Sequence, residues 1–76
     1  MEYYERLKLL REKEELSQKE LGIRLGFSQN ALSQYESHER KLSAEAVIAF
    51  AKFFKVSTDY FLGLTDDPTP AKPSRQ

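Results

Sequence analysis

The chain has 76 residues, of which 39% are hydrophobic and 32% charged. This composition is typical of one small soluble globular domain and excludes a disordered or membrane-embedded chain. Twelve Lys and Arg residues balance twelve Asp and Glu residues, so the net charge is zero. A zero net charge argues against a strong nonspecific binder of polyanions. The sequence contains no cysteine, which excludes disulfide bonds and thiolate metal sites.

No segment of the sequence has the features of a membrane span or a secretion signal. The longest apolar stretch, residues 46–51, is far shorter than the roughly 20 residues needed to cross a bilayer. The acidic Glu2 and Glu5 near the start do not fit the basic start and apolar core of a signal peptide. We therefore expect a cytoplasmic protein that does not contact a membrane.

The first segment has the spacing of an amphipathic helix. Tyr3, Leu7 and Leu10 recur at intervals of four and three residues, which places them on one face of a helix of about twelve residues. The other face is expected to carry the charged residues Glu5, Arg6, Lys8, Glu12 and Lys13.

Two short helices are predicted to follow. Ser17 and Glu20 have the spacing of a capping box, in which the hydroxyl and the carboxylate each accept a backbone N–H at the start of a helix. Gly26 is expected to end this helix, and Ser28 to cap the next one. The pattern predicts two helices of about eight residues, joined by a turn of three or four residues that contains Phe27.

Two further helices complete the predicted domain. Ser43 is placed to cap a helix over residues 44–54, and Ser57 to cap a last short helix. No segment shows the alternation of a strand, so we predict an all-α, five-helix domain over residues 1–64. Residues 65–76 hold all three prolines and only one hydrophobic residue. We expect a disordered tail or the stub of a linker there.

The helix after Ser28 is expected to have one apolar face and one uncharged polar face. Successive residues of an α-helix are about 100° apart, so Ala31, Leu32 and Tyr35 fall opposite a polar arc. This arc consists of Gln29, Asn30, Ser33, Gln34 and Ser37. Its amides and hydroxyls can both donate and accept hydrogen bonds, and Gln and Asn can pair with the N6 and N7 edge of adenine. The arc favours reading of a DNA major groove, with plain solvent exposure as the alternative.

The ordered spacing of these segments resembles that of a known family. The runs that carry the resemblance are Leu16-Ser17-Gln18, Leu25-Gly26-Phe27-Ser28-Gln29, Leu32-Ser33-Gln34-Tyr35-Glu36 and Phe61-Leu62-Gly63. Together they resemble the phage-repressor/Cro-like (Xre-type) helix-turn-helix family over about residues 3–64. The resemblance implies a lambda-repressor-like bundle, in which the second and third helices form the helix-turn-helix and the third enters the major groove.

The resemblance also implies roles for individual residues. Gln29, Asn30, Ser33 and Gln34 lie where the family contacts bases. Ser17, Gln18, Ser28, Ser37, Arg40 and Lys41 lie at or beside positions where it contacts phosphates. Open helix N-termini also favour phosphate on physical grounds, because they present N–H groups and a partial positive charge to an anion. Arg11 and Glu36 occupy positions where the family often has an ion pair that ties the first helix to the third.

Three positions depart from the family pattern. Glu15 and His38 stand where the family commonly has Gly at the ends of the first and third helices. If their φ angles are positive, each costs roughly 1 to 2 kcal/mol relative to Gly. Glu39 stands where a basic residue is frequent.

These observations predict a DNA-binding transcriptional regulator, in particular a repressor, and not an enzyme. The expected partners are a double-stranded DNA operator and a second copy of the chain, with no cofactor and no metal. A C-terminal effector domain or a partner protein outside this chain is a further possibility. The alternative is a helix-turn-helix protein-interaction module that acts on a partner transcription factor or toxin, which the zero net charge and Glu39 favour. His38, the only histidine, is interpreted as a loop residue rather than a metal ligand.

The aromatic residues have two interpretations. A platform that stacks single-stranded bases is conceivable, but most of the aromatic residues fall on inward-facing stripes, which favours core packing. Leu9, Phe53 and Leu64 are expected to be exposed. They are interpreted either as a dimer contact or as scattered surface residues.

Overall fold

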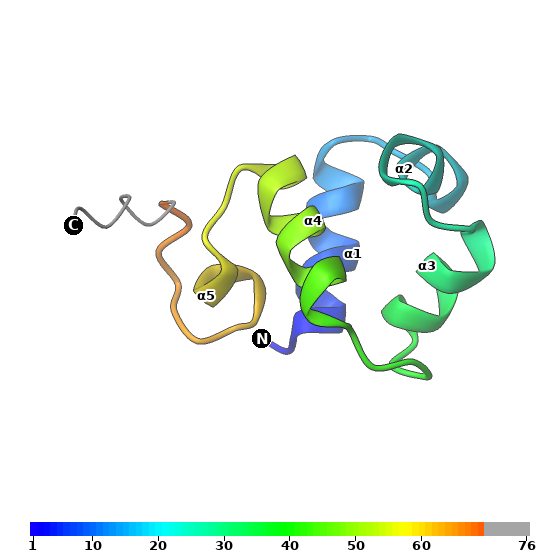
Figure 1. Cartoon of the computed structure of the whole chain (residues 1–76). Coiled ribbons are helices and arrows are strands. Elements are labelled where there is room, and N and C mark those ends of the chain that lie inside the picture. The colour runs from blue at the N-terminus through cyan, green and yellow to red at the C-terminus, as the bar shows by residue number, and fades with distance from the viewer. Residues whose placement is uncertain (70–76) are drawn as a thin grey trace.

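The computed structural model describes residues 1–69, which form five α-helices and no strand (Figure 1). The helices are α1 (Tyr3–Lys13), α2 (Gln18–Leu25), α3 (Gln29–Glu36), α4 (Ala44–Phe54) and α5 (Thr58–Phe61). The predicted all-α, five-helix fold is confirmed, including two helices of eight residues in the middle of the chain. The segment expected to be a tail starts at Thr65, and its part beyond Thr69 lies outside the described residues.

Four serines start α2 to α5 by the same local interaction. The side-chain oxygens of Ser17, Ser28, Ser43 and Ser57 each accept the backbone N–H three residues later at 3.0 Å. Each of these bonds satisfies one of the N–H groups that the first turn of a helix leaves without a partner. The helix starts predicted from the serines are therefore confirmed.

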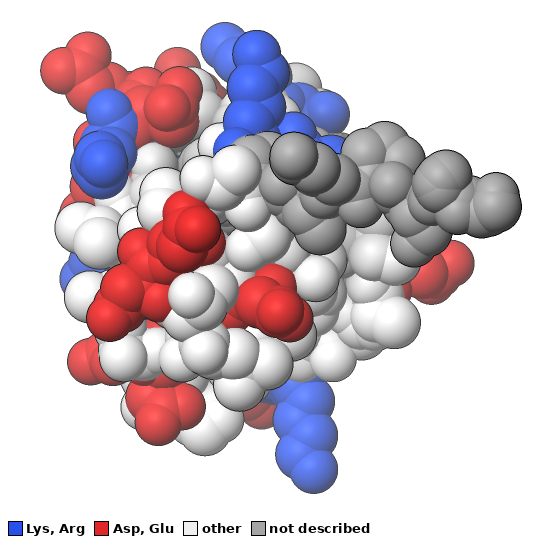
Figure 2. Space-filling view, turned by 90° about the vertical axis from the view of Figure 1, so that its left-hand side faces the viewer, with Lys and Arg blue, Asp and Glu red and all other residues white. Residues whose placement is uncertain are grey.

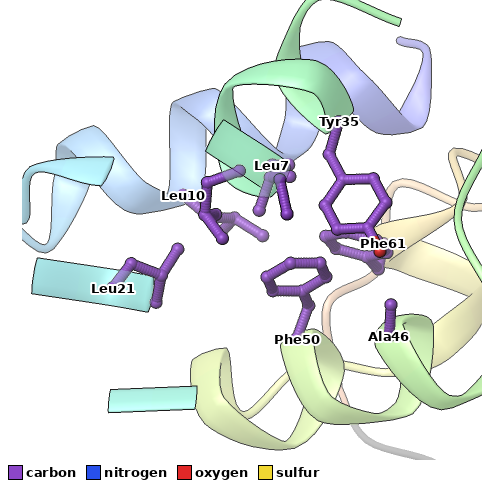
Figure 3. Close-up of a cluster of buried hydrophobic side chains, with 9 residues drawn as sticks. Leu7, Leu10, Leu21, Tyr35, Ala46, Phe50 and Phe61 are labelled. Carbon is purple, nitrogen blue, oxygen red and sulfur yellow. The ribbon is translucent and has the colours of Figure 1, made fainter. Parts of the chain in front are cut away.

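The core lies where all five helices meet, and Phe50 of α4 is at its centre (Figure 3). The ring centroids of Phe27, Phe61 and Tyr35 lie 5.3, 5.6 and 6.0 Å from that of Phe50. Leu7 of α1 is also fully buried in this cluster. Core packing, rather than a platform for single-stranded bases, is thus the role of these aromatic residues.

The surface apolar residues are only partly those expected. Leu9 and Leu64 are exposed, as predicted. The expectation for Phe53 is wrong, because it is half-buried against the core and its ring meets that of Phe54 edge to face. Ile23 and Ile48 are exposed without having been predicted to be.

The expectation for Arg6 is also wrong, because its side chain is buried and not on the charged face of α1. Its Nη1 donates to the carbonyl oxygen of Tyr60 at 2.8 Å, and its guanidinium carbon lies 3.8 Å from the centroid of the Tyr60 ring. A guanidinium can leave water when its N–H groups find acceptors and its flat face meets an aromatic ring. Arg6 thereby fastens α5 to the start of α1.

Among residues 1–69, three residues other than glycine have left-handed backbone conformations, and each lies just after a helix. They are Glu15 with a φ of 58°, His38 with 66° and Lys55 with 59°. The positive φ angles considered from the sequence for Glu15 and His38 are thus found, whereas that of Lys55 was not expected. The His38 ring stacks on Tyr4 with a centroid distance of 4.4 Å and meets Tyr3 edge to face at 5.6 Å. These ring contacts offset the strain at His38 and hold the loop after α3 against α1.

Glycine substitutions at Glu15 and His38 should therefore have different effects on stability. Glu15→Gly is expected to raise the free energy of unfolding by about 0.5 to 1 kcal/mol, because relief of the left-handed strain exceeds the added entropy of the unfolded chain. His38→Gly also loses the stacked ring, worth about 0.5 to 1.5 kcal/mol, so its net effect should be close to zero. Urea unfolding of the two variants and the parent measures both values. Equal gains in the two variants would show that the ring contacts contribute nothing.

Candidate functional site

Two glycines allow α2 and α3 to approach each other closely. Gly26 ends α2 with a φ of 80°, and the N–H groups of Gly26 and Phe27 both donate to the carbonyl oxygen of Gly22, at 2.7 and 2.9 Å. A side chain at Gly22 would collide with the carbonyl oxygen of Phe27. The turn between the two helices therefore packs directly against α2 at Gly22. Gly22 was not singled out from the sequence, since its role depends on this approach.

The outward face of α3 carries uncharged polar side chains. Ala31, Leu32 and Tyr35 are buried and hold the helix to the core, as expected. Gln29, Asn30 and Ser33 are exposed on the other side. These three residues and Gln18, from the start of α2, line one shallow polar hollow. The structure thus brings together four of the residues predicted to form the site.

Two other predicted site residues bond to charged neighbours. Gln34 is half-buried, and its Oε1 accepts a hydrogen bond from Nε of Arg40 at 2.9 Å. The hydroxyl of Ser37 donates to a carboxylate oxygen of Glu39 at 3.0 Å. The C-terminal end of the polar arc is therefore less open than its N-terminal end. Lys41 is exposed in the loop after α3 and lines a separate hollow.

Arg11 and Glu36 form the expected ion pair between α1 and α3. Nε and Nη2 of Arg11 donate to the two carboxylate oxygens of Glu36 at 2.7 and 3.0 Å, and the side chains are 11% and 5% exposed. Nη1 of Arg11 also donates to the carbonyl oxygen of Leu16 at 2.7 Å. The hydrogen bonds to Glu36 raise the pKa of Arg11, although burial acts in the opposite direction.

Glu36 connects this ion pair to the polar hollow. Its Oε1 accepts a second hydrogen bond, from Nε2 of Gln18 at 3.1 Å. A carboxylate only accepts, so the amide nitrogen of Gln18 has to face it. The start of α2 and the end of α3 are thus held together through one buried carboxylate.

The N-termini of α2 and α3 differ in charge. At α2, the carboxylate of Glu20 accepts the N–H of Ser17 at 2.8 Å, and this backbone hydrogen bond is the main cause of the lowered pKa of Glu20. The first turn of α3 has no acidic residue. An anion would therefore meet a compensating negative charge at α2 but not at α3.

The face of the molecule opposite α2 and α3 carries both acidic and basic groups (Figure 2). Figure 2 shows the face turned away from α2 and α3, where acidic groups gather over one half and basic groups stand at the margin. Within residues 1–69, no three His, Cys, Asp or Glu side chains are grouped to hold a metal ion. None of the helices in that range is both long and apolar enough to pass through a bilayer.

Fold and site together define a helix-turn-helix domain in which the outward face of α3 carries uncharged polar side chains. The model of the helix-turn-helix family matches residues 7–61. The chain therefore belongs to this family.

Two curated relatives come from Bacillus subtilis (strain 168). The chain is 35% identical over 68 residues to the uncharacterized HTH-type transcriptional regulator YobD, a match that covers 90% of this chain and 61% of the relative. It is 38% identical over 58 residues to the HTH-type transcriptional regulator ImmR, covering 76% of this chain and 46% of the relative. The chain thus spans about half the length of these relatives.

A similar solved structure is that of the P22 c2 repressor in complex with the synthetic operator 9T in the presence of Tl⁺. It superposes with a TM-score of 0.75 at 34% identity, covering 82% of this chain and 94% of that chain. The expected lambda-repressor-like fold is confirmed by this match.

Removal of one partner of the ion pair should be strongly destabilising. Arg11→Met leaves Glu36 as an unpaired buried charge, and we expect the free energy of unfolding to fall by roughly 3 to 5 kcal/mol. The double variant Arg11→Met/Glu36→Leu removes both charges and should recover much of this loss. Thermal and urea unfolding of the parent and both variants test the pair. A double variant less stable than Arg11→Met would contradict it.

The capping box of α2 should contribute to the acid dependence of stability. A lowered native pKa means that the contribution of Glu20 is present above the pKa of the unfolded glutamate and is lost as the pH falls through the native value. Ser17→Ala removes the hydroxyl but keeps the backbone N–H, so the pKa of Glu20 should move only part of the way to its usual value. An NMR titration of Glu20 in both proteins measures this. A parent pKa at or above the usual value would refute the prediction.

Proposed function

We propose that this chain is the DNA-binding part of a transcriptional regulator that acts as a repressor, and that α3 reads the major groove of double-stranded DNA. The observation that carries this proposal is the polar face of α3. Its exposed amides and hydroxyl lie beside Gln18 in one hollow, while Leu32 and Tyr35 anchor the opposite face. The family and the similarity to a repressor bound to its operator support it.

The chemistry of this face suits base edges. Gln29 and Asn30 lie in the first turn of α3, and Ser33 lies one turn further. The N-terminal part of a recognition helix is the part that contacts base edges in helix-turn-helix complexes. Amides can pair bidentately with adenine, and a serine hydroxyl can bond to donors or acceptors. Side chains without charge gain little from nonspecific attraction, so they suit discrimination more than affinity.

Phosphate contacts are proposed around this face. Ser28 and the first turn of α3 offer N–H groups next to a helix dipole that no acidic residue compensates. Gln18 keeps one amide hydrogen for a phosphate oxygen, and Ser17 keeps its hydroxyl hydrogen. Ser37, in contrast, has to give up its bond to Glu39 to donate to a phosphate. Arg40 and Lys41 contribute full charges. Ser17 has less to offer than the sequence suggested, because its own N–H bonds to Glu20.

The partners and setting of the protein are part of the proposal. A single short helix covers few base pairs, so we propose a homodimer on a palindromic or near-palindromic operator with half-sites about one helical turn apart. The longer curated relatives favour an effector region beyond this domain. The protein acts in the cytoplasm, and it is a regulator without catalytic activity.

A second function remains a candidate because of two acidic residues beside the site. Glu39 bonds to Ser37, and Glu20 occupies the start of α2. Both would repel phosphates, as would be expected of a helix-turn-helix module that binds a partner protein and little DNA. Selection of bound duplexes from a randomised pool at low salt separates the two functions. A DNA-binding regulator enriches a sequence from the pool, and an interaction module enriches none.

Substitution of Gln29 and Lys41 should separate base reading from phosphate binding. Gln29→Ala is expected to cost roughly 1 to 3 kcal/mol on the selected operator and to relax preference at one base pair. Lys41→Ala should weaken binding to every sequence and lower the salt slope by about one. Titrations of both variants against operator and random duplex at several salt concentrations measure these effects. Equal losses from Gln29→Ala on both duplexes would refute base reading by this residue.

A further inference from the structure

The orientation of the Gln34 amide is determined by a charged neighbour. An amide can present either its oxygen or its NH₂ group, and the two are hard to distinguish without the hydrogen-bond network. An arginine side chain only donates hydrogen bonds. Because Nε of Arg40 lies 2.9 Å from the Gln34 side chain, the amide oxygen has to face Arg40. The NH₂ group is therefore the part of Gln34 left for other partners.

The backbone holds the two residues together. The carbonyl oxygen of Gln34 accepts the N–H groups of Glu39 and Arg40, at 2.9 and 3.2 Å. The chain reverses at His38, whose left-handed conformation is supported by its ring contacts to α1. The guanidinium carbon of Arg40 also lies 5.8 Å from the centroid of the buried Tyr35 ring. Arg40 is thus positioned beside α3 although its side chain is exposed.

Gln34 bonded to Arg40 can recognise a different base edge from the one that Gln29 can recognise. Gln29 is exposed in the open hollow, where its amide can turn to present a donor and an acceptor together. Gln34 presents donors, and the bond from Arg40 uses only Nε, which leaves two guanidinium nitrogens for further acceptors. Adenine requires an acceptor for its N6 amine, whereas guanine shows only the acceptors N7 and O6 in the major groove.

We propose that Gln34 and Arg40 act as one donor group that selects guanine over adenine at the base pair facing the C-terminal half of α3. This inference rests on the DNA-binding function proposed above and refines it. It changes the role expected for Gln34, from an adenine reader to a guanine reader, and the role of Arg40, from a phosphate contact to part of a base contact. Phosphate oxygens share the acceptor chemistry of guanine, so the test has to separate the two.

The experiment selects duplexes from a random pool with the parent chain and three variants. Gln34→Glu still accepts the hydrogen bond from Arg40, but its carboxylate has no donor. At the base pair that residue 34 contacts, this variant should prefer a base with an amine in the major groove, such as adenine, and the change identifies that base pair. Arg40→Met removes the donor that turns the amide. Lys41→Met is the matched control, because it removes one positive charge from a neighbouring exposed position of the same loop. Circular dichroism melting confirms that each variant is folded.

The parent should prefer guanine over adenine at this base pair by about tenfold or more, the size typical of one good bidentate contact. Arg40→Met should reduce that ratio severalfold, and Lys41→Met should leave it unchanged while weakening binding to all sequences. If Arg40→Met weakens all sequences equally, the pair contacts phosphate and the inference is wrong, although DNA reading by α3 stands. Selection of adenine there by the parent also overturns the inference. A parent chain that enriches no sequence overturns the proposed function itself.

Discussion

The guanidinium of Arg11 joins three parts of the domain that are separated in sequence. It bonds to Glu36 at the end of α3 and to the carbonyl oxygen of Leu16 in the turn before α2. Glu36 in turn bonds to Gln18 at the start of α2. Because these groups are largely withdrawn from water, each depends on the others to satisfy its hydrogen bonds. The relative position of α2 and α3, and with it the polar hollow, therefore depends on this buried charge pair together with the close turn at Gly22 and Gly26.

Charged groups also fix the orientation of neutral side chains, and for this reason a chain without net charge can present defined donors and acceptors at its site. Two glutamines flank the polar face, and opposite charges orient them in opposite directions. Glu36 draws the amide nitrogen of Gln18 toward itself, and Arg40 draws the amide oxygen of Gln34. One buried charge, Glu36, and one exposed charge, Arg40, thus act here by orienting neutral donors and acceptors. Affinity from long-range attraction is small in such a design, while the pattern of donors and acceptors is well defined.

Most of the fold could be predicted because its signals are local. A serine that caps a helix acts on an N–H three residues away, and an apolar stripe depends only on spacing along one helix. For this reason the four serine caps, the helix bounds and the inward positions of Leu32 and Tyr35 were predictable. Arg6 was misplaced because its burial depends on the Tyr60 ring and carbonyl, 54 residues away in the chain. Gly22 was overlooked because only the approach of Phe27 makes a side chain impossible there.

The sequence by itself determined the helices, their order, the family and the set of polar residues on α3. Each of these follows from residue types at particular spacings along the chain, and this spacing is the same whether the chain is folded or unfolded. Only the tertiary structure decided which polar groups remain free to meet a ligand. Gln29 and Gln34 are chemically identical in the sequence, yet one is exposed in a hollow and the other is bonded to Arg40. The physical reason is that a hydrogen-bonding group recognises a partner only with the capacity that its neighbours in space have not already used.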